Sequence, residues 1–363
     1  MPNPVKVAII GTGRSGDHYY SNCKRMFDIV QLAACADDNA EAARRRAAAL
    51  GTPKACSVAE VLADGEFEIV VHFEGAAMTR RILEAGKHAF AAGSFAMSRE
   101  EADGLIALAE SRGVILGTAP ETVLGASFQA CRKLLNDGWL GSPYGGRAVV
   151  VMDRYSFADP GRFLSETAFY LTNWIHLLGP VRQVTAYRSG YELEAQLPAR
   201  VAEDELPKSP DAHVTATLHF AGGVVANLYI VLNAPQDSHA FEIYGTEGSL
   251  YMPYPQLYGG LVQMKREEEI KLKVPSIYNY GEECSGIGVA DMAYVLRMGT
   301  PHRTNPEVAR HVLDVQLSIG ESLVLGTGVQ VESTCSRPQP LRIGLPDGKL
   351  DETRVEAMTA ADQ

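Results

Sequence analysis

The sequence of 363 residues lacks a basic excess, a membrane-length apolar run and any closely spaced cysteine pair. Its 33 Lys and Arg residues are outnumbered by 44 Asp and Glu residues, giving a formal net charge of −11. Proteins that bind nucleic acid need clustered Lys and Arg to neutralise phosphates, so we expect no nucleic-acid partner. No apolar stretch approaches the roughly 20 residues that cross a bilayer, and we therefore expect no membrane partner.

The six cysteines are scattered and form no C-x-x-C pair. This pattern argues against a zinc site and against a disulfide framework. The opening segment also lacks the charged start, the apolar stretch and the cleavage site of a secretory signal. Together these absences predict a cytoplasmic protein that holds no metal.

Residues 1–121 alternate short apolar runs with amphipathic stretches. The apolar runs read VKVAIIG, IVQLAAC, FEIVVHF, KHAFAAG and GVILGTA. Strands that alternate with helices pair in parallel through right-handed crossovers. We therefore predict an α/β Rossmann domain with a doubly wound parallel sheet.

Residues 122–345 have a different character. Segments in which apolar residues recur at every second position replace the alternation of strands and helices. These segments read RAVVVMD, RQVTAYR, HVTATLHF, VVANLYIVL, HAFEIYG and SLYMP, and the turns AGG and GTEG separate some of them. Such turns are typical of hairpins, so we predict an α+β domain with a large open, mainly antiparallel sheet.

Three helices are expected in this second part, at Ala126 to Asn136, across ETAFYLTNWIHLLG, and across NPEVARHVLDVQLSIGESLVLG. The last begins with Asn305 as N-cap and Pro306 at the first helical position. We expect that helix to pack near the Rossmann domain. The remainder, residues 346–363, is a polar tail that we expect to be partly disordered.

A glycine-rich motif follows the first predicted strand and opens a helix. It matches G-x-G-x-x-G and consists of Gly11, Thr12, Gly13, Arg14, Ser15 and Gly16. The glycines allow a tight turn, approach of a pyrophosphate and close helix packing, while the helix N-terminus attracts phosphates. The motif predicts a dinucleotide site; the alternative is a glycine-rich turn with no ligand.

Asp37 ends the second predicted strand about twenty residues after the glycines, the spacing of the ribose-binding carboxylate in such folds. A carboxylate there accepts hydrogen bonds from the ribose hydroxyls and repels a 2′-phosphate. We therefore expect NAD as the cofactor, with NADP less favoured. The alternative for the dipeptide Asp37-Asp38 is that it caps the following helix, and Asp38 is the better placed of the two residues for that role.

The chain resembles the Gfo/Idh/MocA family of oxidoreductases from Val5 to about Leu341. The resemblance is carried by GTGRSGDHY, LEAGKHAF, AMSREEA, GTAPETVLGASFQACRKLLNDGWLG, FEIYGTEGSL and GVADMAYVLRMGTPHR. It implies oxidation or reduction of a sugar, inositol or similar polyol with NAD(P). It also implies association through the outer face of the C-terminal sheet.

Several positions depart from the family pattern. The Glu-Lys-Pro tripeptide that supplies the proton-handling lysine is replaced by Ala92, Gly93 and Ser94. The family Asp, and the His or Tyr four residues after it, correspond here to Ser165 and Phe169. Glycine in place of lysine is expected to leave the pocket roomier and uncharged.

A third departure lies at the end of the fourth strand, where the family has Thr-Pro followed by a His. This chain has His72, Phe73, Glu74 and Gly75, and looks about three residues shorter there. Open α/β sheets place ligands at the carboxyl ends of their strands. We therefore expect His72, Phe73 and Ala92 to contact the cofactor.

The candidates that remain for catalysis are Glu121, Glu166, Tyr170 and His72. Glu121 lies at the domain junction, and is equally well explained as a first-turn helix carboxylate. Glu166 and Tyr170 lie one turn apart on one helix and share a face, so Glu166 is a substitute for the absent Asp. Tyr170 is alternatively a core residue.

Further polar residues carry weaker hypotheses. His176, among apolar neighbours on the same helix, is expected to be a core residue. Arg154 and Tyr155 could bind substrate or lie in a solvated loop. Tyr278 and Tyr280 could close over the pocket or be surface aromatics.

We expect an NAD-dependent enzyme that acts on a sugar-like or other hydroxylated small molecule through non-standard catalytic residues. A redox-neutral isomerase, epimerase or lyase is the first alternative, and a non-catalytic nucleotide-binding protein is the second. We also expect a homo-oligomer, a dimer or tetramer. The strands HVTATLHF and VVANLYIVL carry apolar residues at both odd and even positions, so the face of the sheet that no helix covers would also expose apolar side chains.

Overall fold

The computed structural model describes residues 3–11, 16–152, 160–189, 213–232, 239–266 and 270–351. The chain divides into two compact units. The first contains Met1–Gln129, Ser276–Ala309 and Pro338–Gln363, and the second contains Ala130–Pro275 and Arg310–Arg337. The chain therefore returns twice to the first unit, which a linear division at residue 121 does not anticipate.

The first unit contains a six-stranded parallel sheet with the strand order β3-β2-β1-β4-β5-β6. This is the order of doubly wound dinucleotide-binding sheets, so the predicted Rossmann architecture is confirmed. The strands are β1 (Val5–Ile10), β2 (Val30–Ala36), β3 (Lys54–Cys56), β4 (Ile69–His72), β5 (His88–Ala91) and β6 (Leu116–Thr118).

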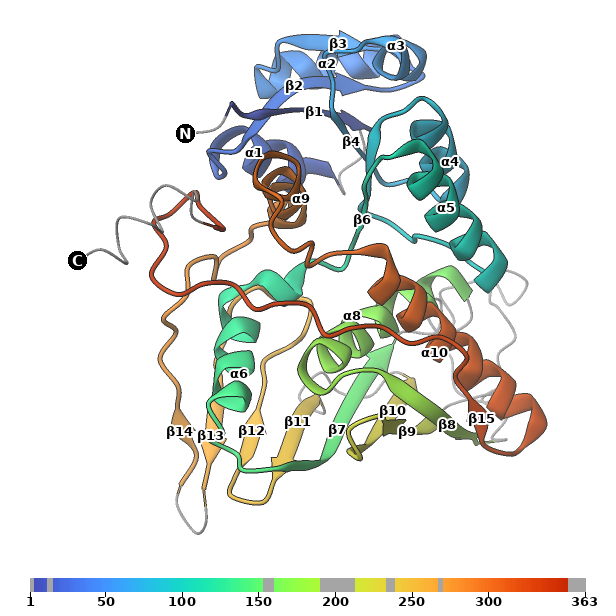
Figure 1. The fold of residues 1–363 in the computed structure, drawn as a ribbon, viewed down its shortest axis with the longest axis vertical. Helices are drawn as coiled ribbons and strands as arrows, with labels where there is room; N and C mark the ends of the chain where they lie inside the picture. The colour runs from blue at the N-terminus through green and yellow to red at the C-terminus, as the bar shows by residue number, and fades with distance from the viewer. Residues whose placement is uncertain are drawn as a thin grey trace, which may run out of the picture. The chain divides into compact units, whose positions relative to one another are not determined.

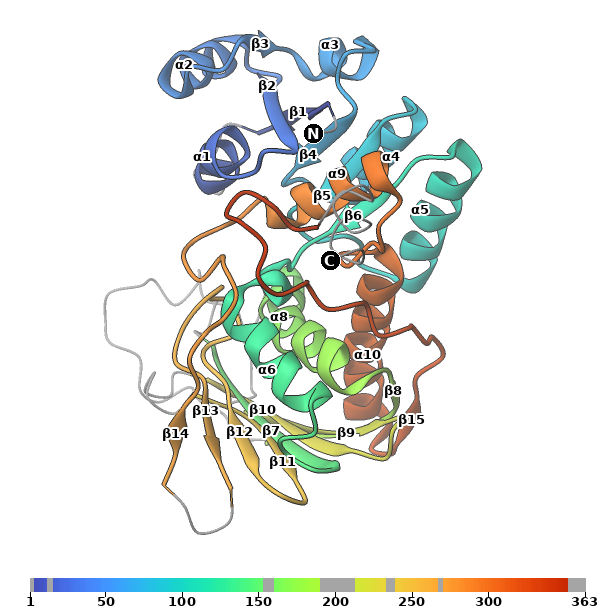
Figure 2. The same ribbon diagram turned by 60° about the vertical axis from the view of Figure 1, so that its left-hand side comes forward.

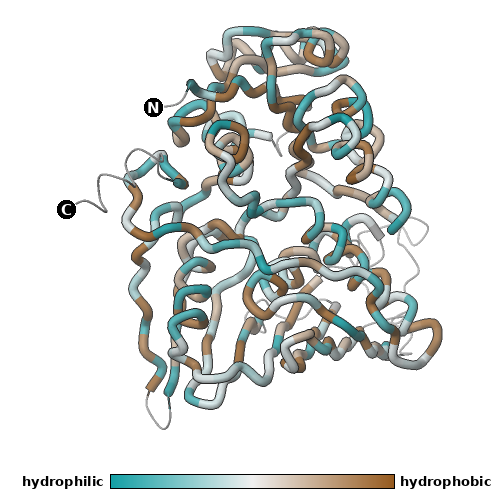
Figure 3. The backbone as a smooth tube through the Cα atoms, viewed as in Figure 1, coloured by the Kyte–Doolittle hydropathy of each residue, from teal (hydrophilic) through white to brown (hydrophobic). Residues whose placement is uncertain are grey.

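Helices connect these strands and cover both faces of the sheet, with α1 on one side and α4 and α5 on the other (Figures 1 and 2). Every residue of β4 is buried, and this strand is a hydrophobic stretch of the tube in Figure 3, whereas the helices alternate in hydropathy. The helices are α1 (Asp17–Arg25), α2 (Ala40–Leu50), α3 (Val58–Ala63), α4 (Ala76–Glu84) and α5 (Arg99–Arg112).

The returning segments complete the first unit. Helix α9 (Ile287–Met298) contacts β2, β4 and β6. Its Asp291 is buried and paired at 2.6 Å with Arg303, whose guanidinium also reaches Asp351 at 3.1 Å. Leu350 is buried as well. The expected polar tail is therefore packed at its beginning, because an ion pair and an apolar side chain hold residues 350 and 351.

The second unit contains a nine-stranded sheet with the order β14-β13-β12-β11-β7-β10-β9-β8-β15. Strands β7 and β10 pair in parallel, and the other neighbours pair antiparallel, so the predicted open, mainly antiparallel sheet is confirmed. The strands are β7 (Pro143–Met152), β8 (Val181–Arg188), β9 (His213–Phe220), β10 (Val225–Leu232), β11 (Ala240–Gly245), β12 (Ser249–Tyr251), β13 (Gln263–Lys265), β14 (Leu272–Lys273) and β15 (Val329–Gln330).

Helices α8 (Pro160–Leu178) and α10 (Pro306–Leu325) lie on one face of this sheet, whereas α6 (Ala126–Asn136) begins in the first unit (Figures 1 and 2). Contrary to expectation, α10 packs from residue 310 onward on the second unit. Its Gln316 donates to the Leu164 carbonyl at 2.6 Å, and its Ser322 hydroxyl accepts the Ala186 amide at 2.8 Å. Of the two C-terminal helices, α9 is the one that packs on the Rossmann sheet.

The two faces of the large sheet differ. In β9 the apolar side chains alternate inward, and the outward positions are His213, Thr215, Thr217 and His219. The expectation of apolar residues at both parities is therefore wrong for β9, although it holds for β10, where Val225 and Tyr229 point outward.

Within the described residues, no helix is both long and apolar enough to span a membrane.

Candidate functional site

Gly11 and Gly16, the described ends of the glycine motif, lie at the carboxyl end of β1 and directly before α1. Gly11 has a φ of +102°, which L side chains rarely adopt, and its amide donates to the Ala36 carbonyl at 2.9 Å. The Tyr20 hydroxyl of α1 lies within hydrogen-bond distance of the carbonyls of Ile9 and Gly11 and donates to them, which holds the end of β1 in place. The intervening residues Thr12, Gly13, Arg14 and Ser15 lie outside the described residues.

Phe73 packs against both described ends of the motif. A Cβ atom added to Gly16 would come within 3.2 Å of the Phe73 ring, and one added to Gly11 within 3.6 Å. Tyr19 packs edge-on against the same ring, with the ring centroids 5.3 Å apart. Gly16 is therefore constrained by packing against Phe73 within the protein itself, whereas Gly11 is constrained by its backbone conformation. Contact of Phe73 with the cofactor stays a prediction.

Asp37 follows β2 and is half-buried. One of its carboxylate oxygens accepts the amide of Asn39 at 2.9 Å. Asn39, and not Asp38, caps α2, because its side-chain oxygen accepts the amides of Glu41 and Ala42. The capping alternative for the Asp37-Asp38 dipeptide is therefore wrong, which leaves Asp37 as the carboxylate at the end of the strand.

His72 ends β4, and its side chain is 0% exposed. Its Nε2 atom lies 3.0 Å from the Thr79 hydroxyl of α4. Burial lowers the pKa of His72 to about 4, so the ring is neutral at physiological pH. The amide of Ala92, after β5, donates to the His72 carbonyl at 2.9 Å.

Gly93 does not leave an open space. A Cβ atom there would lie 2.7 Å from the carbonyl oxygen of Phe73, which is far closer than Cβ atoms normally approach an oxygen. The backbone after β4 fills the place of a side chain at position 93. The expectation of a roomier pocket is therefore wrong at this position, because the Phe73 carbonyl occupies the volume next to Gly93.

Glu121 is 2% exposed, and its carboxylate binds backbone rather than facing solvent. Its two oxygens accept the amide of Gly286 at 2.6 Å and the amide of Gly288 at 2.5 Å. These amides lie at the N-terminus of α9, where a negative charge also interacts favourably with the helix dipole. Glu121 is thus a helix-terminus carboxylate, but for a helix 165 residues later in the chain.

The second unit brings five polar side chains together between α8 and the large sheet, and we call them the α8–β11 cluster. The Gln256 amide donates to the Glu166 carboxylate at 2.5 Å, and the Tyr170 hydroxyl lies 3.2 Å from Nδ1 of His239. The Tyr254 ring packs edge-on against His239, with centroids 5.0 Å apart, and against Tyr170 at 6.2 Å. The cluster consists of Glu166, Tyr170, His239, Tyr254 and Gln256.

The electrostatics of this cluster favour uncharged rings beside one carboxylate. Burial raises the pKa of Tyr170, so that its hydroxyl keeps its proton. Burial also raises the pKa of Tyr254, with a further contribution from the nearby Glu166. For His239 burial lowers the pKa, which favours a neutral imidazole that can accept a proton.

Sequence reasoning identified only Glu166 and Tyr170 of this cluster. His239 directly precedes β11, and Tyr254 and Gln256 shortly follow β12. Because β11 and β12 are antiparallel, the start of β11 and the end of β12 lie at the same edge of the sheet. Polar residues next to the ends of predicted strands are the sequence signal that could have identified His239, Tyr254 and Gln256.

Other residues considered from the sequence lie elsewhere. Burial lowers the pKa of His176 to about 3, as suits a core residue. Arg154 and Tyr155 lie outside the described residues. In the part of the chain that the structure describes, no group of three or more His, Cys, Asp or Glu side chains could hold a metal ion.

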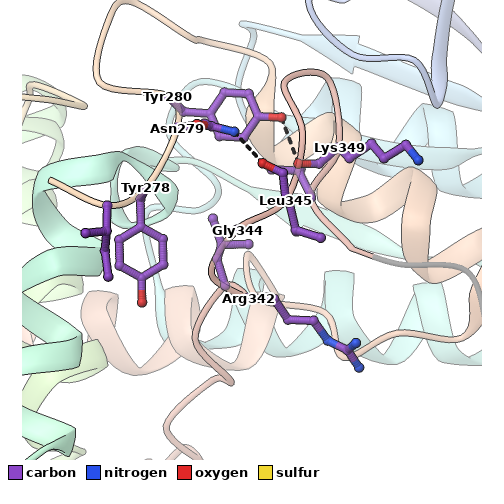
Figure 4. A pocket seen from close by; sticks show the side chains of 10 residues that line it. Tyr278, Asn279, Tyr280, Arg342, Gly344, Leu345 and Lys349 are labelled. Carbon is purple, nitrogen blue, oxygen red and sulfur yellow. Dashed lines mark hydrogen bonds between the residues drawn. The ribbon is translucent and has the colours of Figure 1, made fainter. Parts of the chain in front are cut away.

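Tyr278 and Tyr280 line a small hollow of the first unit beside the C-terminal segment (Figure 4). The Tyr280 hydroxyl donates to the Lys349 carbonyl at 2.9 Å, and Asn279 donates to the Leu345 carbonyl at 2.7 Å. The hollow measures about 40 Å³, enough for a few water molecules and too small for a sugar. The Tyr280 hydroxyl therefore holds the C-terminal segment in place.

Two family models match the chain. The model described as "Oxidoreductase family, NAD-binding Rossmann fold", named for Gfo/Idh/MocA, matches residues 5–119. The Gfo/Idh/MocA C-terminal domain model matches residues 128–251. The two models together therefore match both the Rossmann sheet and most of the large sheet.

Solved structures share the fold at low sequence identity. An NAD-binding oxidoreductase from Klebsiella pneumoniae is 20% identical, with a TM-score of 0.74 over 90% of this chain and 99% of its own. Levoglucosan dehydrogenase in complex with NADH and levoglucosan is 19% identical, with a TM-score of 0.75 over 91% and 100%. Biliverdin reductase from Synechocystis sp. PCC 6803 is 20% identical, with a TM-score of 0.68 over 89% and 100%. No curated protein matches the chain.

Proposed function

Because this chain belongs to the Gfo/Idh/MocA oxidoreductase family, whose enzymes depend on NAD(P), we propose that it uses NAD to oxidise or reduce a sugar-like or other hydroxylated small molecule. The observation that carries the proposal is the α8–β11 cluster. It supplies a carboxylate, an amide, an imidazole and phenol hydroxyls in one place, and its Glu166 and Tyr170 lie on the helix that the sequence singled out for catalysis. Such groups recognise hydroxyls and move their protons.

The first unit supports the cofactor part of the proposal. The positive φ of Gly11 and the close packing at Gly16 are consistent with the tight turn that such a cofactor needs. Asp37 directly follows β2, at the place from which a carboxylate would bind the adenosine ribose. When bound, NAD supplies hydride chemistry; Gly11, Gly16 and Asp37 would hold it, with Phe73 and Ala92 beside them.

Proton transfer needs a group other than a lysine at position 93. That position has no room for a side chain, because the Phe73 carbonyl lies 2.7 Å from an added Cβ. Glu121 and His72 are buried and engaged with Gly286, Gly288 and Thr79. We therefore assign the substrate hydroxyl to the α8–β11 cluster, with Glu166 as the first candidate for its general base.

The direct test follows nicotinamide absorbance with NAD and a panel of polyols that includes levoglucosan. Turnover of a polyol should fall at least about a hundredfold in Glu166→Gln, the usual effect of losing a positioned base, while NAD affinity is unchanged. Glu110→Gln, at an exposed position of α5, is the matched control and should behave as wild type. Unchanged turnover in Glu166→Gln would remove that residue from the mechanism.

Cofactor preference is a separate prediction. NAD should bind more tightly than NADP, because a 2′-phosphate would meet the Asp37 carboxylate. Asp37→Asn should narrow the difference by raising NADP affinity. Calorimetry with both cofactors measures this, and equal affinities in the wild-type protein would exclude Asp37 from the ribose site.

A redox-neutral reaction is the second candidate, and the closed position at Gly93 favours it. A protein without the usual lysine could isomerise, epimerise or eliminate without net change of the nicotinamide. Product formation from a polyol while the nicotinamide absorbance stays constant would favour this candidate over the dehydrogenase.

A further inference from the structure

We propose that Tyr20, supported by Arg46, is a positioning residue for the cofactor of this protein. The inference rests on the NAD-binding part of the proposed function and concerns residues of the first unit alone. Tyr20 lies outside the G-x-G-x-x-G motif, yet its side chain contacts Gly11 and Gly16, the two described ends of that motif. It would hold the motif in a conformation that binds the phosphates of the cofactor.

The hydroxyl of Tyr20 restrains the first glycine of the motif. It lies 3.0 Å from the Ile9 carbonyl oxygen and 2.9 Å from that of Gly11, so two acceptors share its one proton. Burial raises the pKa of Tyr20, which keeps the hydroxyl protonated and able to donate. The amide of Gly11 is held as well, because it donates to the Ala36 carbonyl of β2 at 2.9 Å. Since a peptide group is planar, holding the Gly11 oxygen limits the rotation of the whole group to which it belongs.

The ring of Tyr20 restrains the last glycine of the motif. A Cβ atom added to Gly16 would come within 3.1 Å of this ring, which is tighter than most such contacts. Gly16 directly precedes α1, and Tyr20 lies one turn further along that helix. Backbone N–H groups at the start of such a helix bind the pyrophosphate of a dinucleotide. A turn that is restrained before binding loses less conformational entropy when the ligand arrives.

Arg46 of α2 supports the tyrosine. Its guanidinium carbon lies 5.0 Å from the centroid of the Tyr20 ring, and a cation over an aromatic face is attracted to it. The same guanidinium pairs with Asp17 of α1, and the Arg46 side chain is only 18% exposed. Arg46 therefore joins α2 to α1 and packs the ring between them.

The ion pair has a second consequence, which concerns charge. Asp17 lies in the first turn of α1, close to the helix N-terminus at which a phosphate would bind. A carboxylate there stabilises the helix, but it repels a phosphate because both are negative. Arg46 offsets the charge of Asp17. Loss of Arg46 should therefore weaken the binding of NAD and NADP alike, since both carry the pyrophosphate.

The first test measures the affinity for NAD and for NADP by calorimetry in the full-length Tyr20→Phe protein, which keeps the ring and removes the hydroxyl. Both affinities should fall about three- to tenfold, the usual effect of losing one hydrogen bond, and their ratio should stay as in the wild type. Tyr144→Phe, at a tyrosine that is 60% exposed, is the matched control and should bind as the wild type does. Wild-type affinities in folded Tyr20→Phe, or a loss confined to one of the two cofactors, would overturn the proposal.

The second test does not require that Tyr20→Phe folds. Arg46→Met keeps a long side chain without the charge, and it should lower both affinities about two- to fivefold, the usual size of a charge effect at a helix terminus. Adding Asp17→Asn should recover most of that loss, because the repelling carboxylate is then gone; a merely structural arginine would show no such recovery. Arg45→Met, at a neighbouring side chain that is 71% exposed, is the matched control.

The outcomes separate this inference from the proposed function. A loss in Arg46→Met that Asp17→Asn leaves unchanged would overturn the role given to Arg46. Wild-type protein that binds NAD as tightly as both variants do would refute the inference and leave the proposed cofactor in place. Wild-type protein that binds neither NAD nor NADP would refute the proposed function, and the inference would fail with it.

Discussion

At the residue scale, Gly93 shows how one missing side chain is coupled to its neighbour. The Phe73 carbonyl occupies the volume that a Cβ at position 93 would need. The same Phe73 places its ring against the glycine turn after β1. Replacing Gly93 would therefore disturb the nucleotide turn as well as the end of β4.

We predict that Gly93→Ala destabilises the protein by about 1 to 3 kcal/mol, the usual cost of forcing extra atoms into a packed region. Denaturant unfolding measures the loss. Gly65→Ala is the control, because an added Cβ there meets nothing within 4 Å, and it should change stability by no more than about 0.5 kcal/mol. A Gly93→Ala protein as stable as the control would mean that Phe73 yields easily.

At the scale of secondary-structure elements, Glu121 connects the end of the Rossmann motif to α9. Its carboxylate satisfies the amides of Gly286 and Gly288, which the helix itself leaves without partners. Gly286 has a φ of +100° and no side chain to cap the helix, so the cap comes from a distant residue. The position of α9 on the sheet depends on this contact.

We predict that Glu121→Ala lowers the free energy of unfolding by about 2 to 4 kcal/mol, since two buried amides then lack acceptors. Thermal and denaturant unfolding test this, and Glu121→Gln should lose less because its amide oxygen still accepts one bond. NAD-dependent turnover of folded Glu121→Gln should stay within a few fold of wild type. A hundredfold fall in turnover with an intact fold would instead restore Glu121 as the base.

At the scale of the whole molecule, buried neutral histidines make stability depend on pH. Burial lowers the pKa of both His72 and His311 to about 4. In the unfolded chain each should titrate near 6.5, so the unfolded state binds more protons between pH 6.5 and 4. Stability is therefore complete above about pH 6.5 and decreases as the pH falls toward 4.

We predict a loss of about 2 kcal/mol for each of these histidines between pH 7 and pH 5. Urea unfolding at the two pH values measures their combined loss together with that of the other buried histidine, His176. His72→Leu should reduce the pH dependence by about one histidine's share, whatever its effect on stability at pH 7. An unchanged pH dependence in that variant would show that His72 is not buried in its neutral form.

The outer face of the nine-stranded sheet leads to the prediction of a homo-oligomer, a dimer or tetramer. Among the described elements, α8 and α10 lie on the inner face of this sheet (Figure 2). The outer face carries the exposed Tyr187 and Val225 along with the partly exposed Tyr229, and tyrosine is enriched at protein interfaces.

Light scattering at micromolar concentration should therefore report a mass of two or four chains. Tyr229→Glu, in the middle of the face, should shift the protein toward monomer, whereas Glu110→Lys on α5 should not. A wild-type protein that stays monomeric would refute the prediction.

The sequence by itself determined the types of the two sheets and most of their elements. Local periodicity and turn residues defined β1, α6 and β8 to β12, and the glycines with Asp37 identified the type of the first sheet. Hydrophobic period and backbone conformation are properties of short segments, so they can be read without knowledge of distant contacts.

Only the tertiary structure decided what the polar residues do. It connected Glu121 to amides 165 residues away, closed the volume at Gly93 with the Phe73 carbonyl, and brought His239 to Tyr170. Each of these contacts joins segments that are far apart in the sequence and have no common local pattern. Burial then set the protonation of His72 and Tyr170, because desolvation depends on everything packed around a group and not on its neighbours in the chain.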